Sequence, residues 1–132
     1  MRYALFVCLI LLSMVGYQQR KVWNMGGAII WLVTMFGCAA LFFAIGMYAK
    51  RIDKPMWFWS GVEVDPATVS DIKAYNAENA RMWQWYSVWY WVAGIAWIWS
   101  KTVALIVLVL SCTVGIVILI TTFHKIEKKY KA

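Results

Sequence analysis

The sequence predicts an all-α integral membrane protein, a single helical bundle of four, alternatively three, transmembrane helices with a short cytoplasmic or interfacial helix. Two observations predict this fold. Hydrophobic residues make up 64% and charged residues 14% of the 132 positions, whereas soluble domains have about 45–50% and about 25%. The hydrophobic residues also gather in four long runs without an internal charge. Such a chain cannot cover itself with polar groups, which excludes a soluble enzyme, a disordered tail and a disulfide-stapled secreted domain.

The first run, residues 3–19, is the weakest candidate for a span. Its apolar part, residues 3–17, reaches about 22 Å as a helix, which is shorter than the ~30 Å hydrocarbon core. Arg2 followed by an apolar run is also typical of a signal peptide. No small-x-small cleavage site follows, because Met14 lies two residues before Gly16. We expect a retained span, and a cleaved leader is the alternative.

The other three runs, residues 26–49, 82–99 and 102–123, are each predicted to form a membrane-spanning helix. Small residues recur in them at helical spacing, and small residues let helix backbones approach closely in lipid. We therefore expect helix packing at these positions, although Gly and Ala are also common in spans by chance. The expected packing residues are Gly37, Ala40, Ala44, Gly94, Ser111 and Gly115.

The distribution of Lys and Arg predicts the orientation. The N-terminus, the 50–81 connection and the 124–132 tail hold ten of these residues, and the other two connections hold three. Cytoplasmic segments are rich in Lys and Arg, so the 50–81 loop and the basic tail are placed in the cytoplasm. These clusters account for the net charge of +7. Nucleic acid is not an expected partner, because the chain has no basic stripe on a soluble fold and no nucleic-acid motif.

The three cysteines, Cys8, Cys38 and Cys112, lie in different apolar runs. Their odd number and the lack of a CxxC pattern predict neither a disulfide framework nor a metal site. We interpret them as small apolar packing residues. No cofactor is expected.

The 50–81 loop carries several structural signals. Pro55 ends the second helix. The aromatic run Met56-Trp57-Phe58-Trp59 is either an anchor at the lipid headgroups or one wall of a binding groove. Asp65-Pro66 and Ser70-Asp71 are two candidate helix starts. A short helix from either start would lie on the membrane surface or lead into the third span.

A polar cluster that contains Asn76, Glu78, Asn79 and Arg81 precedes the third span. It either binds a partner or a ligand headgroup, or it caps helices while Arg81 reaches lipid phosphates. We expect the partner or ligand surface to be formed by Trp57, Trp59, Tyr75, Asn76, Asn79 and Trp83.

The third run is unusually rich in Trp and Tyr. Trp residues near its two ends are typical of the membrane interfaces. Trp89, Tyr90 and Trp91 lie near its middle, where their N–H and O–H groups need partners or a wet cavity. Packing against neighbouring helices is favoured over an aromatic cage for an organic cation.

Residues 25–130 contain Lys54-Pro55-Met56-Trp57-Phe58-Trp59-Ser60-Gly61, Asp71-Ile72-Lys73-Ala74-Tyr75-Asn76 and Asn79-x-x-Met82-Trp83. This layout resembles small uncharacterised multi-span membrane proteins of Gram-positive bacteria. It is distantly similar to the three-span part of immunity proteins that protect a producer from its own sporulation-delaying toxin. The resemblance implies a multi-pass protein of the bacterial cytoplasmic membrane, with the C-terminus placed in the cytoplasm by the Lys and Arg distribution, and it implies no catalytic residue.

No enzymatic function is expected, because the one histidine, His124, has no catalytic partner set and no phosphate loop is present. A proton-coupled exporter needs a carboxylate inside a span, and the four runs contain none. We expect a non-enzymatic interaction or immunity-type protein that binds a membrane partner or peptide. The alternative is a small-molecule or cation transporter, or a passive pore, acting as an oligomer. The expected partners are the lipid bilayer, a protein or membrane-active peptide, and a second copy of the chain.

Overall fold

The computed structural model describes residues 9–10, 25–57 and 63–132. Within these residues the fold is all-α with no strand element, as predicted. The helices are α2 (Met25–Ala49), the 3-10 turn η1 (Pro66–Thr68), α3 (Ile72–Ala96) and a third long segment. That segment joins α4 (Lys101–Leu110), the π-helical turn η2 (Ser111–Gly115) and α5 (Ile116–Tyr130). Of the predicted first run, only Leu9 and Ile10 are described, both helical and exposed. The rest of that run lies outside the described residues.

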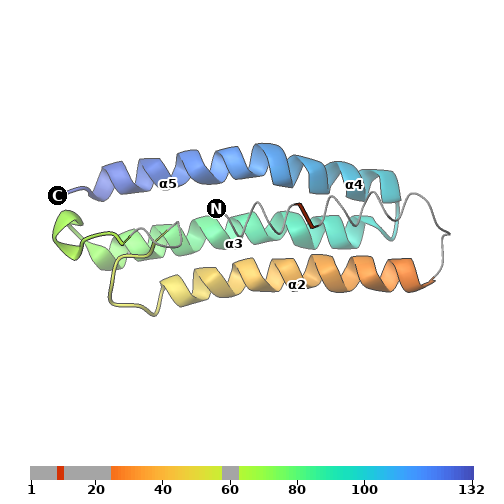
Figure 1. Ribbon diagram of the computed structural model, residues 1–132, viewed down its shortest axis with the longest axis horizontal. Helices are drawn as coiled ribbons and strands as arrows, with labels where there is room; N and C mark the ends of the chain where they lie inside the picture. Colours follow the sequence, from red (N-terminus) through yellow and green to blue (C-terminus); the bar gives the residue numbers. More distant parts are fainter. Residues whose placement is uncertain (1–8, 11–24, 58–62) are drawn as a thin grey trace.

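Helix α3 is the central element. It lies between α2 and the continuous α4–α5 segment, and all three follow the long axis of the molecule (Figure 1). The chain reverses direction between successive helices. One end of the bundle, which we name the loop end, holds residues 50–57 and 63–71 and the C-terminus, and the opposite end holds the turn of residues 97–100.

Two helices of the described chain are long and apolar enough to cross a membrane: Met25–Ala49 and Lys101–Tyr130. Helix α3 has a similar length, about 37 Å at 1.5 Å per residue, but is not one of them. Lys73, Glu78 and Arg81 lie in its first three turns, and its many Trp and Tyr side chains carry polar atoms. It also ends earlier than the predicted residue 99, since residues 97–99 form a turn.

Both predicted helix starts in the loop are capped. The Asp65 carboxylate accepts a hydrogen bond from the backbone N–H of Ala67 at 2.9 Å, at the start of η1. The Asp71 carboxylate accepts one from the N–H of Ala74 at 2.9 Å, at the start of α3. The helix from Asp71 therefore leads directly into the third run, and the separate short helix is only a single 3-10 turn. Helix α5 likewise continues to Tyr130, through most of the predicted 124–132 tail.

The α2–α3 interface is built from aromatic contacts. Trp31 stacks on Trp97 with ring centroids 4.6 Å apart and donates its indole N–H to the Ala93 carbonyl at 3.3 Å. Phe42 stacks with Trp83 at 5.8 Å and touches the rings of Tyr86 and Tyr90, each at 5.0 Å. These contacts bury one side of α2, formed by Trp31, Met35, Ala39, Phe42, Gly46 and Ala49.

The predicted packing residues of α2 do not belong to this interface. Gly37, Ala40 and Ala44 are exposed on the other side of the helix, and a side chain at Gly37 would meet nothing within 4 Å. Helix α2 is apolar all round, so its pattern does not show which side faces α3. Packing of Gly37, Ala40 and Ala44 against another segment or chain stays a prediction.

The remaining predicted packing residues do lie at helix contacts. A Cβ atom on Gly94 would lie 2.6 Å from the Phe36 ring, and one on Gly115 would lie 3.1 Å from Tyr86. Ser111 is buried. Gly46, which was not predicted, marks the tightest backbone approach, because a Cβ there would lie 2.8 Å from the carbonyl oxygen of Ala80.

Substituting Gly46→Ala is expected to lower the free energy of unfolding by about 1–3 kcal/mol, since the added methyl group must push the backbone of α3 away. Gly37→Ala is the matched control in the same helix. It should leave stability unchanged or raise it by up to about 1 kcal/mol through helix propensity. Thermal and denaturant unfolding in detergent measures both, and equal losses for the two variants would contradict the close approach at Gly46.

Candidate functional site

The side chain of Asn76, on α3, forms hydrogen bonds with the loop that follows α2. Its side-chain oxygen accepts a hydrogen bond from the backbone N–H of Met56 at 2.8 Å. Its amide nitrogen donates to the carbonyls of Ile52 at 3.1 Å and Lys54 at 2.8 Å. One buried amide thus satisfies three backbone groups of a loop, as buried polar groups require.

Tyr75 reinforces the same attachment. Its hydroxyl donates a hydrogen bond to the Met56 carbonyl at 3.2 Å, and its ring contacts Phe123 and Tyr130 of α5 edge-on. Burial raises the pKa of the Tyr75 phenol, so the hydroxyl stays protonated and remains a donor. Tyr75 therefore joins the loop, α3 and α5.

The five described residues of the predicted binding surface do not form one exposed surface. Tyr75, Asn76, Asn79 and Trp83 are buried, whereas Trp57 is half-exposed and Trp59 lies outside the described residues. Asn79 donates only to the carbonyl of Tyr75, one helical turn back, at 3.0 Å. Its side-chain oxygen is buried and has no hydrogen-bond partner within the described chain. The structural alternative expected Asn76 to cap a helix, whereas it binds backbone groups of the loop after α2.

At the loop end, the C-terminus is hydrogen-bonded to the start of α3 and to the residues just before it. We call this attachment the closure. The backbone N–H of Ser70 donates to the carbonyl of Tyr130, and that of Ala132 donates to Thr68, both at 2.8 Å. The Glu78 carboxylate accepts hydrogen bonds from Lys129 at 2.5 Å and from the Tyr130 hydroxyl at 2.9 Å. The hydrogen bond from Lys129 lowers the pKa of Glu78, and the same bond raises the pKa of Lys129. The end of α5 is thus tied to the start of α3.

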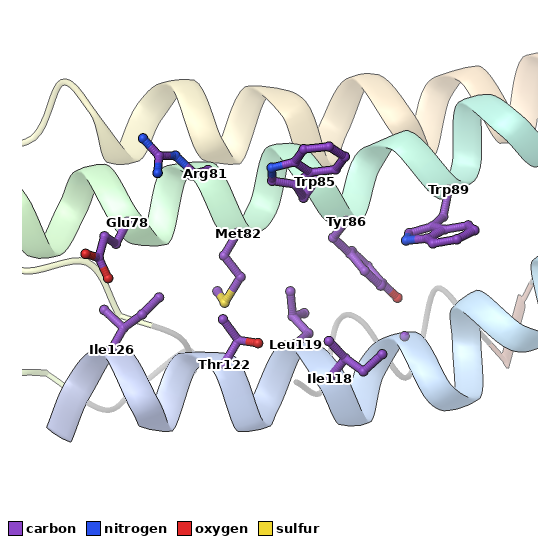
Figure 2. A pocket seen from close by; sticks show the side chains of 11 residues that line it. Glu78, Arg81, Met82, Trp85, Tyr86, Trp89, Ile118, Leu119, Thr122 and Ile126 are labelled. Atoms are coloured by element: carbon purple, nitrogen blue, oxygen red, sulfur yellow. The ribbon is translucent and has the colours of Figure 1, made fainter. Parts of the chain in front are cut away.

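A groove of about 430 Å³ runs between α3 and α5, beginning at this closure. Figure 2 shows Glu78 and Arg81 at its loop end and the rings of Trp85 and Trp89 farther along α3. The residues of α5 that line it are apolar apart from Thr122. The sequence analysis missed this groove. The spacing of Arg81, Trp85 and Trp89, four residues apart, was the available signal, because such residues share one face of a helix.

Several polar atoms of the groove have no internal partner. Within the described chain, the Arg81 guanidinium makes no hydrogen bond or ion pair, and neither do the indole N–H groups of Trp85 and Trp89. Trp85 is 67% exposed and Trp89 is 54% exposed. The Glu78 carboxylate, in contrast, is already occupied by Lys129 and Tyr130. The mouth of the groove therefore presents a positive charge.

Polar groups in the middle of the third run were predicted to need hydrogen-bond partners. The hydroxyls of Tyr86 and Tyr90 have such partners. The Tyr86 hydroxyl donates to the carbonyl of Ser111 at 3.2 Å and lies 3.0 Å from the hydroxyl of the fully buried Tyr90. Ser111 begins the π-helical turn η2, and such turns free carbonyl groups from the regular helix ladder. Trp91 packs on Phe36 at 5.1 Å.

Comparisons with protein-family models, with curated proteins and with solved structures found no match to this chain. In the described part of the chain, no group of three or more His, Cys, Asp or Glu side chains is placed to hold a metal ion. The α3–α5 groove is therefore the candidate functional site, and it is assigned from its geometry alone.

Substituting Asn76→Leu is expected to lower the free energy of unfolding, because the Met56 N–H and two carbonyls lose their partner, at about 1–3 kcal/mol for each buried group left unpaired. Asn79→Leu is the matched control, three residues along the same helix. It removes an oxygen that has no partner within the described residues and one hydrogen bond to the Tyr75 carbonyl, so the loss should be clearly smaller than for Asn76→Leu. Unfolding measured in detergent compares the two variants, and an Asn79→Leu loss as large as that of Asn76→Leu would contradict these roles.

Substituting Glu78→Gln should release the C-terminus and speed hydrogen exchange at the amides of Ser70 and Ala132 several-fold. Because the folded-state pKa of Glu78 is lowered, its stabilising effect is present at neutral pH and is lost as the pH falls through that pKa. The native protein should lose protection at these amides in acid, after correction for intrinsic exchange, and the variant should show no such step. Glu127→Gln is the control, since within the described residues the ion pair of Glu127 is with its helix neighbour His124. An identical acid profile for Glu78→Gln and the native protein would rule out this closure.

Proposed function

We propose that the protein is a small non-enzymatic membrane protein that binds a membrane-embedded partner or peptide through the outward face of α3. It spans a bacterial cytoplasmic membrane four times, alternatively three times, with the loop end and the C-terminus in the cytoplasm. The first run, residues 3–19, supplies the fourth span.

The arrangement of the helices supports this placement. Helix α3 packs against both helices that are apolar enough to span, runs antiparallel to them and nearly matches their length. If α2 and α4–α5 cross a bilayer, α3 must return the chain between them. The outer faces of the two apolar helices expose many large aliphatic side chains, which suit lipid better than water. They include Ile29, Ile30, Val33, Leu41, Val117 and Ile118.

One observation carries the binding function: the outward face of α3 displays large aromatic rings away from the helix ends. Trp85, Val88, Trp89 and Val92 follow one another on this face, all exposed. Lipid contact alone does not require Trp so deep in a span, where an unpaired indole N–H is costly. Trp and Arg are also the residues most enriched at binding hot spots, and Arg81 begins this face.

The resemblance of residues 25–130 to immunity proteins supports a membrane-active peptide as the partner. A second function has one observation in its favour. The exposed small residues Gly37, Ala40 and Ala44 would allow two copies to pack closely, as a passive pore or transporter acting as an oligomer requires.

The proposal is tested by affinity capture from native membranes in mild detergent, with a C-terminal tag and quantitative mass spectrometry. The double variant Trp85→Leu/Trp89→Leu should recover at least about tenfold less of a stoichiometric partner than the native protein, which corresponds to about 1.4 kcal/mol. Trp99→Leu is the matched control, because Trp99 is 79% exposed but lies at the turn end of the bundle.

Equal recovery of the partner by the double variant and by Trp99→Leu would contradict the role of the α3 face. Recovery of the chain alone, as an oligomer lost in Gly37→Leu, would favour the pore or transporter. For the immunity function, cells without the gene should become sensitive to a co-resident peptide toxin. Unchanged sensitivity would leave that function without support.

A further inference from the structure

The α3–α5 groove is small compared with a helix. Its two ends on α3, Glu78 and Trp89, are about 16 Å apart along the helix axis, and its volume is about 430 Å³. A helical segment of the same length and 10 Å across occupies roughly 1,250 Å³. A single extended hydrocarbon chain therefore suits the groove, whereas a partner helix would cover it from outside.

The groove is charged at one end only. Arg81 is exposed at the loop end, where its charge contributes to the lowered pKa of Glu78, and its guanidinium makes no hydrogen bond or ion pair within the described residues. Apart from Glu78 and Arg81, the lining carries no charge and is mostly apolar or aromatic: Met82, Trp85, Tyr86 and Trp89 from α3, and Gly115, Ile118, Leu119, Thr122 and Ile126 from η2 and α5. Figure 2 shows these side chains following one another along the two helices. The matching ligand has a charged head and a hydrocarbon tail.

The net positive charge at the mouth of the groove favours a ligand with a negatively charged head. Glu78 is held by Lys129 and Tyr130, so the two cations Arg81 and Lys129 exceed the one carboxylate. A guanidinium binds phosphate through two parallel hydrogen bonds. Basic sites between membrane helices on the cytoplasmic side are suited to anionic headgroups.

We propose that the groove binds one acyl chain of an anionic phospholipid, with the phosphate on Arg81 and the chain along Trp85 and Trp89 toward Gly115. Gly115 lines the far part of the groove, where the Tyr86 ring packs 3.1 Å from where a Cβ atom would stand. The inference rests on the proposed membrane placement and is independent of which protein or peptide partner is bound.

The test is native mass spectrometry of the full chain in nanodiscs made with equal amounts of phosphatidylglycerol and phosphatidylcholine. The native protein should retain phosphatidylglycerol at least about fivefold over phosphatidylcholine. Arg81→Gln should abolish this preference. Lys73→Gln, which removes one positive charge from the same helix two turns away and outside the groove, should keep it. Ile118→Trp, which narrows the groove, should reduce retention of both lipids.

Equal retention of the two lipids by the native protein would overturn the proposal, as would equal losses in Arg81→Gln and Lys73→Gln. A dimer that persists in place of bound lipid would assign the groove to a second copy and also overturn it. Competition by millimolar inorganic phosphate without any effect of Ile118→Trp would indicate a headgroup-only site and contradict the acyl chain. Recovery of the protein in the membrane fraction distinguishes these outcomes from failure of the proposed placement.

Discussion

The described structure depends on the pairing of polar groups along the inner side of α3. A hydroxyl or amide inside an apolar bundle needs a partner, because no water is at hand to replace it. Asn76 therefore binds the loop after α2, Tyr86 binds the π-helical turn, and the Ala93 carbonyl receives the indole N–H of Trp31. Each of these bonds joins α3 to a different segment. Because hydrogen bonds are directional, they also set how far along α3 each segment lies, which apolar contacts alone would leave loosely defined.

The two sides of α3 serve different purposes. Among the described residues, the inner side of α3 holds four of the seven buried aromatic side chains and three of the four buried polar ones, while the outer side keeps its Trp rings uncovered from Arg81 onward. The closure by Lys129 and Tyr130 connects the two, since it occupies Glu78 and leaves Arg81 as the available charge at the groove mouth. The contacts that hold the C-terminus at the loop end therefore also determine the charge at the mouth of the candidate site.

The sequence predicted the helices better than their contacts. Charged residues bracket α2, and Asp71 has the side chain that caps α3, so these features follow from local chemistry. The orientation of α2 could not be predicted, because Gly37 and Ala39 are equally plausible contacts in a helix that is apolar all round. The burial of Tyr75, Asn76 and Asn79 was missed because polar residues before a span are expected in water. The groove combines residues of α3 and α5 that are about 30 to 50 positions apart in the sequence, and no local pattern encodes such a pairing.

The π-helical turn η2 also sets the rotation of α5 about its own axis. One residue of an α-helix corresponds to about 100° of rotation, so the extra residue in this turn determines which side of α5 faces α3. Ala104 and Leu108 before the turn, and Leu119, Phe123 and Ile126 after it, are all buried. Removing a single residue from Ser111–Gly115 would rotate α5 as a whole and carry Lys129 away from Glu78. The spacing of this short turn is therefore a constraint on chain length, since insertions and deletions that loops tolerate would here misalign a whole helix.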